Sequence, residues 1–141
     1  IAKKNVVQAK KFSEMLEASV NQYTKLLHGF LGEEAVKAVT GIEPLRGNQK
    51  GRDFYIDDMY YEVKTRSITR LLIYPNYSVS VYSKSTTSDY YIFVFLQKNL
   101  KTAVVVGSLP VQEFNKKAKW APRGKEGWEV LVKDVEEWNY E

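Results

Sequence analysis

Acidic and basic side chains alternate with apolar ones along residues 53–64, which read Asp-Phe-Tyr-Ile-Asp-Asp-Met-Tyr-Tyr-Glu-Val-Lys. Side chains alternate between the two faces of a strand, so Glu62 and Lys64 share one face of a second strand and Asp53 lies on one face of a first. The apolar side chains of both strands can cover one core only if the polar side chains of both strands point away from it. Two hairpin registers satisfy this condition, with Asp53 opposite Glu62, or with Asp53 opposite Lys64 and Glu62 on the diagonal. Either register brings the two carboxylates within about 5–8 Å of each other.

Two carboxylates at that separation suit a hard divalent cation, which prefers oxygen ligands. Such a cation lowers the pKa of a water molecule and neutralises charge during phosphodiester hydrolysis. Lys64 lies two residues beyond Glu62 and adds positive charge where negative charge develops. The pattern therefore indicates metal-assisted hydrolysis of a phosphodiester. The alternative for the same residues is an exposed hairpin face with a cross-strand ion pair, a contact worth about 0–1 kcal/mol.

The elements that would position these residues are a hairpin and a buried strand. Phe54–Asp57 and Tyr60–Arg66 read as two strands joined by a tight turn near Asp58, so Asp57 and Asp58 are interpreted as turn residues rather than metal ligands. Residues 90–97 are nearly all apolar, as in a central strand buried on both faces.

Three segments show helical patterns. Residues 4–18 are amphipathic at helical spacing. Residues 22–40 form a second helical pattern that Gly41 ends, although two glycines near its middle leave two shorter helices as an alternative. Pro110–Lys119 is a third helical segment, with its proline near the first turn.

The remaining segments complete a mixed α/β pattern. We expect strands at Ile42–Arg46, Thr102–Val106 and Trp128–Val132, and a loop or short helix over residues 76–88. The predicted fold class is α/β (α+β), with one central mixed sheet flanked by helices. The chain has no long linker, which predicts a single domain over residues 1–141 with the helix 4–18 as an accessory element.

Composition narrows the possible functions. The net charge is +4, and residues 71–125 carry eight basic and two acidic side chains, as suits a polyanion-binding protein. The absence of cysteine excludes disulfides, a cysteine nucleophile and cysteine-based zinc sites, and the single His28 excludes a His-rich metal cluster. No apolar run approaches the length of a membrane span and no signal-peptide pattern is present, so we expect a cytoplasmic protein without a membrane partner.

The order of these features resembles the PD-(D/E)XK nuclease superfamily, which includes restriction endonucleases and archaeal-type Holliday junction resolvases. The matching residues are Asp53, the hairpin, and Glu62-Val63-Lys64, preceded by a helical Gly32-Glu33. The resemblance covers roughly residues 26–97 and implies a restriction-endonuclease-like core, in which a helix and an apolar strand follow the hairpin. Residues 76–88 and 90–97 are the candidates for that helix and strand. Arg52 stands where the family name has Pro, a residue that family members often lack.

The resemblance also implies roles for individual residues. Asp53 and Glu62 would bind Mg²⁺ or Mn²⁺ with the Val63 carbonyl, and Lys64 would orient or activate the attacking water. Glu33 would approach the metal site from the helix. Glu34 is a rival for that role. Glu33 lies nearer the buried face of the helix when this face is judged from the apolar residues that follow it, and Glu34 does when the face is judged from those that precede it. The Gly-Glu match favours Glu33.

Several basic residues are candidates for binding DNA phosphates. Arg66 and Arg70 follow the active strand, and Lys84 lies in a hydroxyl-rich segment. A further basic cluster, which fits a DNA-binding edge and a solvated helix face equally well, comprises Lys116, Lys117 and Lys119.

Two functions from different classes remain at this point. The first is a Mg²⁺-dependent endonuclease acting on DNA as a junction-resolving, restriction or homing, or phage or repair enzyme, in a homodimer or higher homo-oligomer. The second is a non-catalytic nucleic-acid-binding module that keeps the nuclease fold. The presence of every acid and the Lys together favours the first.

Overall fold

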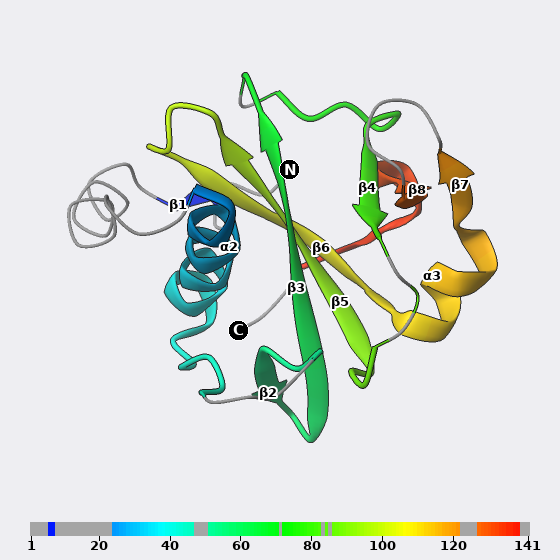
Figure 1. Ribbon diagram of the computed structural model, residues 1–141, viewed down its shortest axis with the longest axis horizontal. Helices are drawn as coiled ribbons and strands as arrows, with labels where there is room; N and C mark the ends of the chain where they lie inside the picture. The colour runs from blue at the N-terminus through cyan, green and yellow to red at the C-terminus, as the bar shows by residue number, and fades with distance from the viewer. Residues whose placement is uncertain are drawn as a thin grey trace.

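The computed structural model describes residues 6–7, 24–46, 51–70, 72–82, 84, 86–121 and 127–138. A mixed six-stranded sheet forms the centre of this part of the chain (Figure 1). Its strands follow the order β1 (Val6–Val7), β6 (Ala103–Pro110), β5 (Tyr90–Gln97), β3 (Met59–Ile68) and β2 (Phe54–Ile56), while β9 (Glu136–Glu137) also pairs with β6. β3 and β5 are parallel, and the other pairs are antiparallel. The described residues are thus of a mixed α/β class.

A second, three-stranded antiparallel sheet lies beside the first. Its order is β4 (Ser78–Val81), β8 (Gly127–Leu131) and β7 (Lys119–Ala121). The expectation of one sheet is therefore wrong, because the chain between β3 and β5 leaves the central sheet and contributes β4 to the smaller one.

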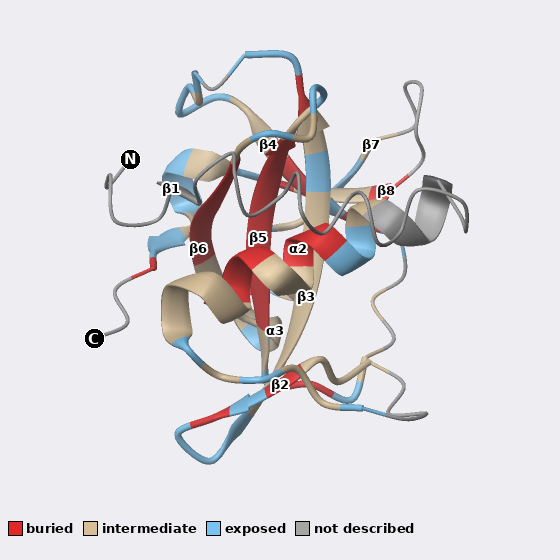
Figure 2. Cartoon of the chain, turned by 90° about the vertical axis from the view of Figure 1, so that its left-hand side faces the viewer, coloured by how far each residue is buried: buried red, intermediate tan, exposed pale blue. Residues whose placement is uncertain are grey.

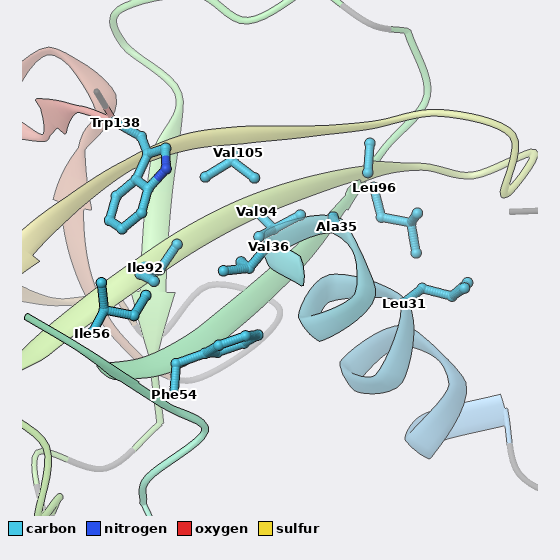
Figure 3. Close-up of a cluster of buried hydrophobic side chains, with 11 residues drawn as sticks. Leu31, Ala35, Val36, Phe54, Ile56, Ile92, Val94, Leu96, Val105 and Trp138 are labelled. Carbon is cyan, nitrogen blue, oxygen red and sulfur yellow. The ribbon is translucent and has the colours of Figure 1, made fainter. Parts of the chain in front are cut away.

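Strand β5 is the centre of the core, as its apolar sequence predicts. All of its residues from Tyr91 to Leu96 are buried (Figure 2). Helix α2 (Thr24–Thr40) covers one face of the sheet, where Leu31 and Val36 pack with Ile92 and Val94 of β5 (Figure 3). On the other face, a second apolar cluster joins β5 to the smaller sheet and to α3 (Val111–Lys117).

Helix α2 is continuous through its two glycines, so the predicted helix over 22–40 is confirmed as one element within the described residues. Gly41 ends it with a φ of 74°, and its N–H donates to the Lys37 carbonyl over 2.7 Å. This left-handed conformation is the glycine C-cap that the sequence predicts.

The hairpin of β2 and β3 has the first of the two expected registers. Phe54 pairs with Tyr61 and Tyr55 with Tyr60, so continuing the pairing by one residue sets Asp53 opposite Glu62. Asp57 and Asp58 form the turn with φ values of 50° and 67°. Both angles are left-handed, as a two-residue hairpin turn requires.

Two predicted segments differ from the observed structure. Ile42–Arg46 is not a strand, although the Leu45 N–H donates to the Asp53 carbonyl over 2.7 Å. Residues 76–88 hold β4 rather than a loop or a short helix, because Val79 and Val81 point together into the second core cluster. The helix that the family resemblance implies between β3 and β5 is accordingly absent from the described residues of this connection.

The ends of the other elements also shift. β6 continues to Pro110, four residues past the predicted strand end, and α3 stops at Lys117, so that Lys119 belongs to β7. The strand predicted at Trp128–Val132 is confirmed as β8, but it spans Gly127–Leu131 and Val132 begins a 3-10 turn. The predicted helix 4–18 is wrong at Val6–Val7, which pair with β6, and its other residues lie outside the described part of the chain. No helix that the structure describes is long and apolar enough to cross a membrane.

Candidate active site at the edge of the hairpin

Glu62 and Lys64 lie side by side on β3. The Lys64 Nζ is 3.1 Å from the Glu62 Oε1, and the side chains are 32% and 17% exposed for Lys64 and Glu62. The other carboxylate oxygen, Oε2, accepts a hydrogen bond of 2.8 Å from the Thr86 hydroxyl. Glu62 is therefore held from two sides, in a position that solvent still reaches.

Asp53 lies just before β2 and contacts the same segment of β3. Its Oδ2 accepts a hydrogen bond of 2.7 Å from the Val63 N–H, and its own N–H donates to the Tyr61 carbonyl over 2.8 Å. The N–H and C=O groups of one strand residue point to the same side. The Val63 carbonyl therefore faces the edge at which the Asp53 carboxylate lies.

The electrostatics of Asp53 reflect this crowding. Burial raises the pKa of its carboxyl above the ordinary value, the hydrogen bond from Val63 opposes that shift, and the nearby Glu62 raises the pKa further while Lys64 lowers it. Asp53 and Glu62 thus form an interacting pair of carboxylates, as the hairpin register predicts.

Gly32 brings helix α2 close to β3. A Cβ atom at Gly32 would lie 1.9 Å from the Thr65 Oγ1, so the absence of a side chain at Gly32 allows the helix and this threonine to pack closely. The next residue, Glu33, has its pKa raised to about 7 by burial, by Asp53 and by Glu34, in that order. Asp53 therefore acts on Glu33, whereas Lys37 on the same helix has its pKa raised first by a hydrogen bond to Glu43 and then by Glu34. Glu33, the residue that the Gly-Glu pattern favours, is therefore near enough to Asp53 for the two carboxylates to interact.

The donor atoms at this site fit a hard divalent cation. The residues that would hold it are Asp53 and Glu62 through their carboxylates and Val63 through its carbonyl. A cation there would offset the burial and the Glu62 repulsion, both of which raise the Asp53 pKa. The described residues contain no group of three or more His, Cys, Asp or Glu side chains placed to hold a metal. The site thus offers two carboxylates and one carbonyl, a set that Mg²⁺ completes with water.

A loop that the sequence pattern does not predict supports the site. The Thr86 hydroxyl contacts both Glu62 and the Gly51 carbonyl, and the Ser88 hydroxyl also donates to Gly51. This loop ties the chain just before Asp53 to the face that carries Glu62. The hydroxyl-rich composition of residues 76–88 suits phosphate contacts or a polar surface loop and does not by itself indicate the hydrogen bonds to Glu62 and Gly51.

Arg66 lines two adjoining cavities beside the site, and Arg70 lines the second of them. The first has a volume of about 480 Å³ and reaches from Lys64 along β3, and the second has a volume of about 470 Å³. Arg66, Ser67 and Lys98 line both cavities. Lys98 and His28, which lines the first, were not among the predicted DNA-binding residues. The pairing of distant segments brings them here, since the Lys98 N–H donates to the Ile68 carbonyl over 2.8 Å and the His28 Nδ1 lies 3.4 Å from the Ser67 hydroxyl.

The other predicted DNA-binding residues lie apart from these cavities. The Lys84 Nζ lies 3.8 Å from the centre of the Trp128 ring and donates to the Asn115 carbonyl over 3.4 Å, so its charge is used within the fold. Lys116 pairs with Glu113 over 3.4 Å. Lys117 and Lys119 line another cavity of about 410 Å³ beside β7. In the smaller sheet, β8 lies between β7 and β4.

Comparison with known proteins adds no family assignment to this geometry. No protein-family model matches the chain, and no curated protein matches it significantly.

Proposed function

We propose that the chain is a divalent-metal-dependent endonuclease that hydrolyses phosphodiester bonds of DNA. The observation that carries the proposal is the hydrogen bond of 2.7 Å between the Asp53 carboxylate and the Val63 N–H. This hydrogen bond fixes Asp53 against the Glu62-Val63-Lys64 segment of β3. In the same segment the Glu62 carboxylate and the Lys64 ammonium group lie 3.1 Å apart.

The roles of the residues follow from their positions. A bound divalent cation would supply a Lewis acid that lowers the pKa of water and neutralises phosphate charge. Asp53, Glu62 and the Val63 carbonyl would hold it. Lys64 contributes positive charge beside them, where it can stabilise negative charge developing on the phosphate. Glu33, with a pKa of about 7, can accept or release a proton near neutral pH at the same edge.

A second candidate function is a DNA-binding module without catalysis. Two observations favour it: the described connection between β3 and β5 lacks the helix of the family pattern, and Lys64 is already paired with Glu62. In this reading the ion pair and the Asp53–Val63 hydrogen bond stabilise the hairpin, and the basic cavities bind DNA without cleaving it.

We further propose that the hairpin, α2 and β5 correspond to a restriction-endonuclease-like core. The supporting features are their order along the chain and the position of Glu33 on the helix that crosses β3. We also propose that the chain assembles as a homodimer or a higher homo-oligomer. Light scattering at several protein concentrations measures the assembly directly.

Metal binding separates the two functions before any substrate is chosen. Calorimetric titration with Mn²⁺ should show one binding event in the wild type, and Asp53→Asn and Glu62→Gln should lose or weaken it. Asp57→Asn is the matched control, because Asp57 lies in the hairpin turn away from the site. Equal Mn²⁺ binding in all four proteins would contradict the proposed metal site.

A further inference from the structure

We infer that the two adjoining cavities form a path for a single nucleic-acid strand, which leads from Lys64 along β3 to Arg70. This inference rests on the proposed function and narrows its substrate to DNA with a single-stranded segment. We call this path the β3 groove. Its described lining combines five residues with basic side chains and two exposed tyrosines, Tyr74 and Tyr82, and the basic residues are His28, Lys64, Arg66, Arg70 and Lys98.

The shape of the β3 groove suits one strand rather than two. Each cavity measures about 470–480 Å³, within the range of pockets that enclose a small ligand. Arg66, Ser67 and Lys98 line both cavities, so the two lie directly beside one another along β3. A cavity of this size can hold a few linked nucleotides, whereas the body of a duplex could only lie across the opening.

The charges of the groove favour a phosphate backbone. Four side chains with permanent positive charge line it, and Glu129 is the one acid among its described lining residues. Arg66 is held in place: its Nη1 donates to the Ser78 carbonyl and hydroxyl, and its guanidinium stacks 5.6 Å from the centres of the Tyr77 and Phe95 rings. A guanidinium has five N–H donors, so further donors remain for a phosphate.

Exposed aromatic rings supply the second element of single-strand binding. Tyr82 is 72% exposed and lines the first cavity, and Tyr74 is 51% exposed and lines the second. Unpaired bases stack on such rings in proteins that bind single strands, and a basic groove follows the backbone. In a duplex the bases already stack on one another, so the two tyrosines would gain little from it.

The groove joins the candidate active site at one residue. Lys64 lines the first cavity and contacts Glu62 at the hairpin. A strand lying in the groove would therefore bring one of its phosphates to Lys64. This continuity predicts that single-strand binding and the metal site serve the same reaction.

Fluorescence anisotropy in EDTA tests the groove without any cleavage. The probes are a labelled twelve-nucleotide oligothymidylate and a labelled twelve-base-pair duplex. We expect the wild type to bind the oligothymidylate at least tenfold more tightly. Tyr82→Ala should weaken oligothymidylate binding about tenfold, the effect of losing one stacked base, whereas Tyr82→Phe should keep it because the ring remains.

Two charge-reversal variants test whether the strand follows the β3 groove. Lys98→Glu should weaken oligothymidylate binding, and Lys101→Glu, the same change three residues away and outside the described lining of both cavities, should not. Tighter duplex binding, or equal effects of the two Lys variants, would overturn the groove. Duplex-only cleavage would overturn it and leave the nuclease proposal intact. Groove-dependent binding without metal-dependent cleavage in any substrate would leave the groove intact and overturn the nuclease.

Discussion

Gly32 is the contact through which helix α2 positions Glu33, and its replacement by alanine gives a prediction that needs no substrate. The added Cβ would lie 1.9 Å from the Thr65 Oγ1 and 3.1 Å from the Thr65 Cβ. Rotating Thr65 can move Oγ1 but not the Thr65 Cβ, so the helix and β3 must still separate slightly. Overpacking of this kind costs about 1–3 kcal/mol of unfolding free energy.

Gly29 provides the matched control on the same helix. A Cβ atom there meets nothing within 4 Å, and the position is exposed. Gly29→Ala should therefore raise the unfolding free energy by up to about 1 kcal/mol, because alanine favours a helix over glycine. The same propensity gain applies to Gly32→Ala, so the difference between the two variants isolates the overpacking. We expect Gly29→Ala to be the more stable by about 1–3 kcal/mol.

Urea unfolding of the metal-free protein, followed by circular dichroism, measures both variants. A double-mutant cycle with Thr65→Ala should recover part of the loss in Gly32→Ala, since it removes Oγ1, the nearest atom. Gly32→Ala should also weaken Mn²⁺ binding if the displaced helix takes Glu33 away from Asp53. Equal stability of Gly29→Ala and Gly32→Ala would refute the close approach of α2 to β3.

Three further predictions concern the charges of the site and groove. Glu33 has a pKa raised from 4.5 to about 7, so its stabilising effect is full below about pH 4.5 and is lost as the pH rises through 7. At pH 8, metal-free Glu33→Gln should therefore be more stable than the wild type by roughly 1 kcal/mol, after allowance for solvent screening. At pH 4 it should be no more stable. Equal stability of the two proteins at pH 8 would refute the raised pKa of Glu33. Lys64→Ala should keep most of its DNA affinity in Ca²⁺ but lose at least about 10²-fold in single-turnover cleavage in Mg²⁺, and the reverse pattern would make Lys64 a binding residue. The affinity for oligothymidylate should fall with salt at a log–log slope of about −3, because four permanent cations each contribute about −0.7 on single strands; a slope near zero would exclude the groove as the binding surface.

The hairpin could be predicted from sequence because its signals are local. Apolar and polar residues alternate on both sides of Asp57-Asp58, and a one-residue slip would bury the charges. The same pattern left two registers, and the structure has the one that sets Asp53 opposite Glu62. The buried strand β5 was equally clear, since residues 90–97 are nearly all apolar.

Other parts of the structure depend on contacts between distant segments. Strand β4 alternates Ser78-Val79-Ser80-Val81, a strand pattern that the surrounding Ser and Thr residues concealed. β6 extends past Val106 because Gly107 fits against the Glu136 backbone, where a Cβ atom would lie 2.0 Å from the carbonyl oxygen. The β3 groove was not predictable, because strand pairing and the helix crossing, rather than chain order, bring Lys98 and His28 to Ser67.

The most direct test of the central claim is cleavage of a DNA panel with and without Mg²⁺ or Mn²⁺. The panel comprises a supercoiled plasmid, a linear duplex, a single strand and a four-way junction, each incubated with the wild type and with Asp53→Asn. We predict cleavage of at least one substrate that requires the metal, stops in EDTA and is absent in Asp53→Asn. No cleavage by the folded wild type across the panel, or equal cleavage by Asp53→Asn, would contradict a metal-dependent nuclease at this hairpin.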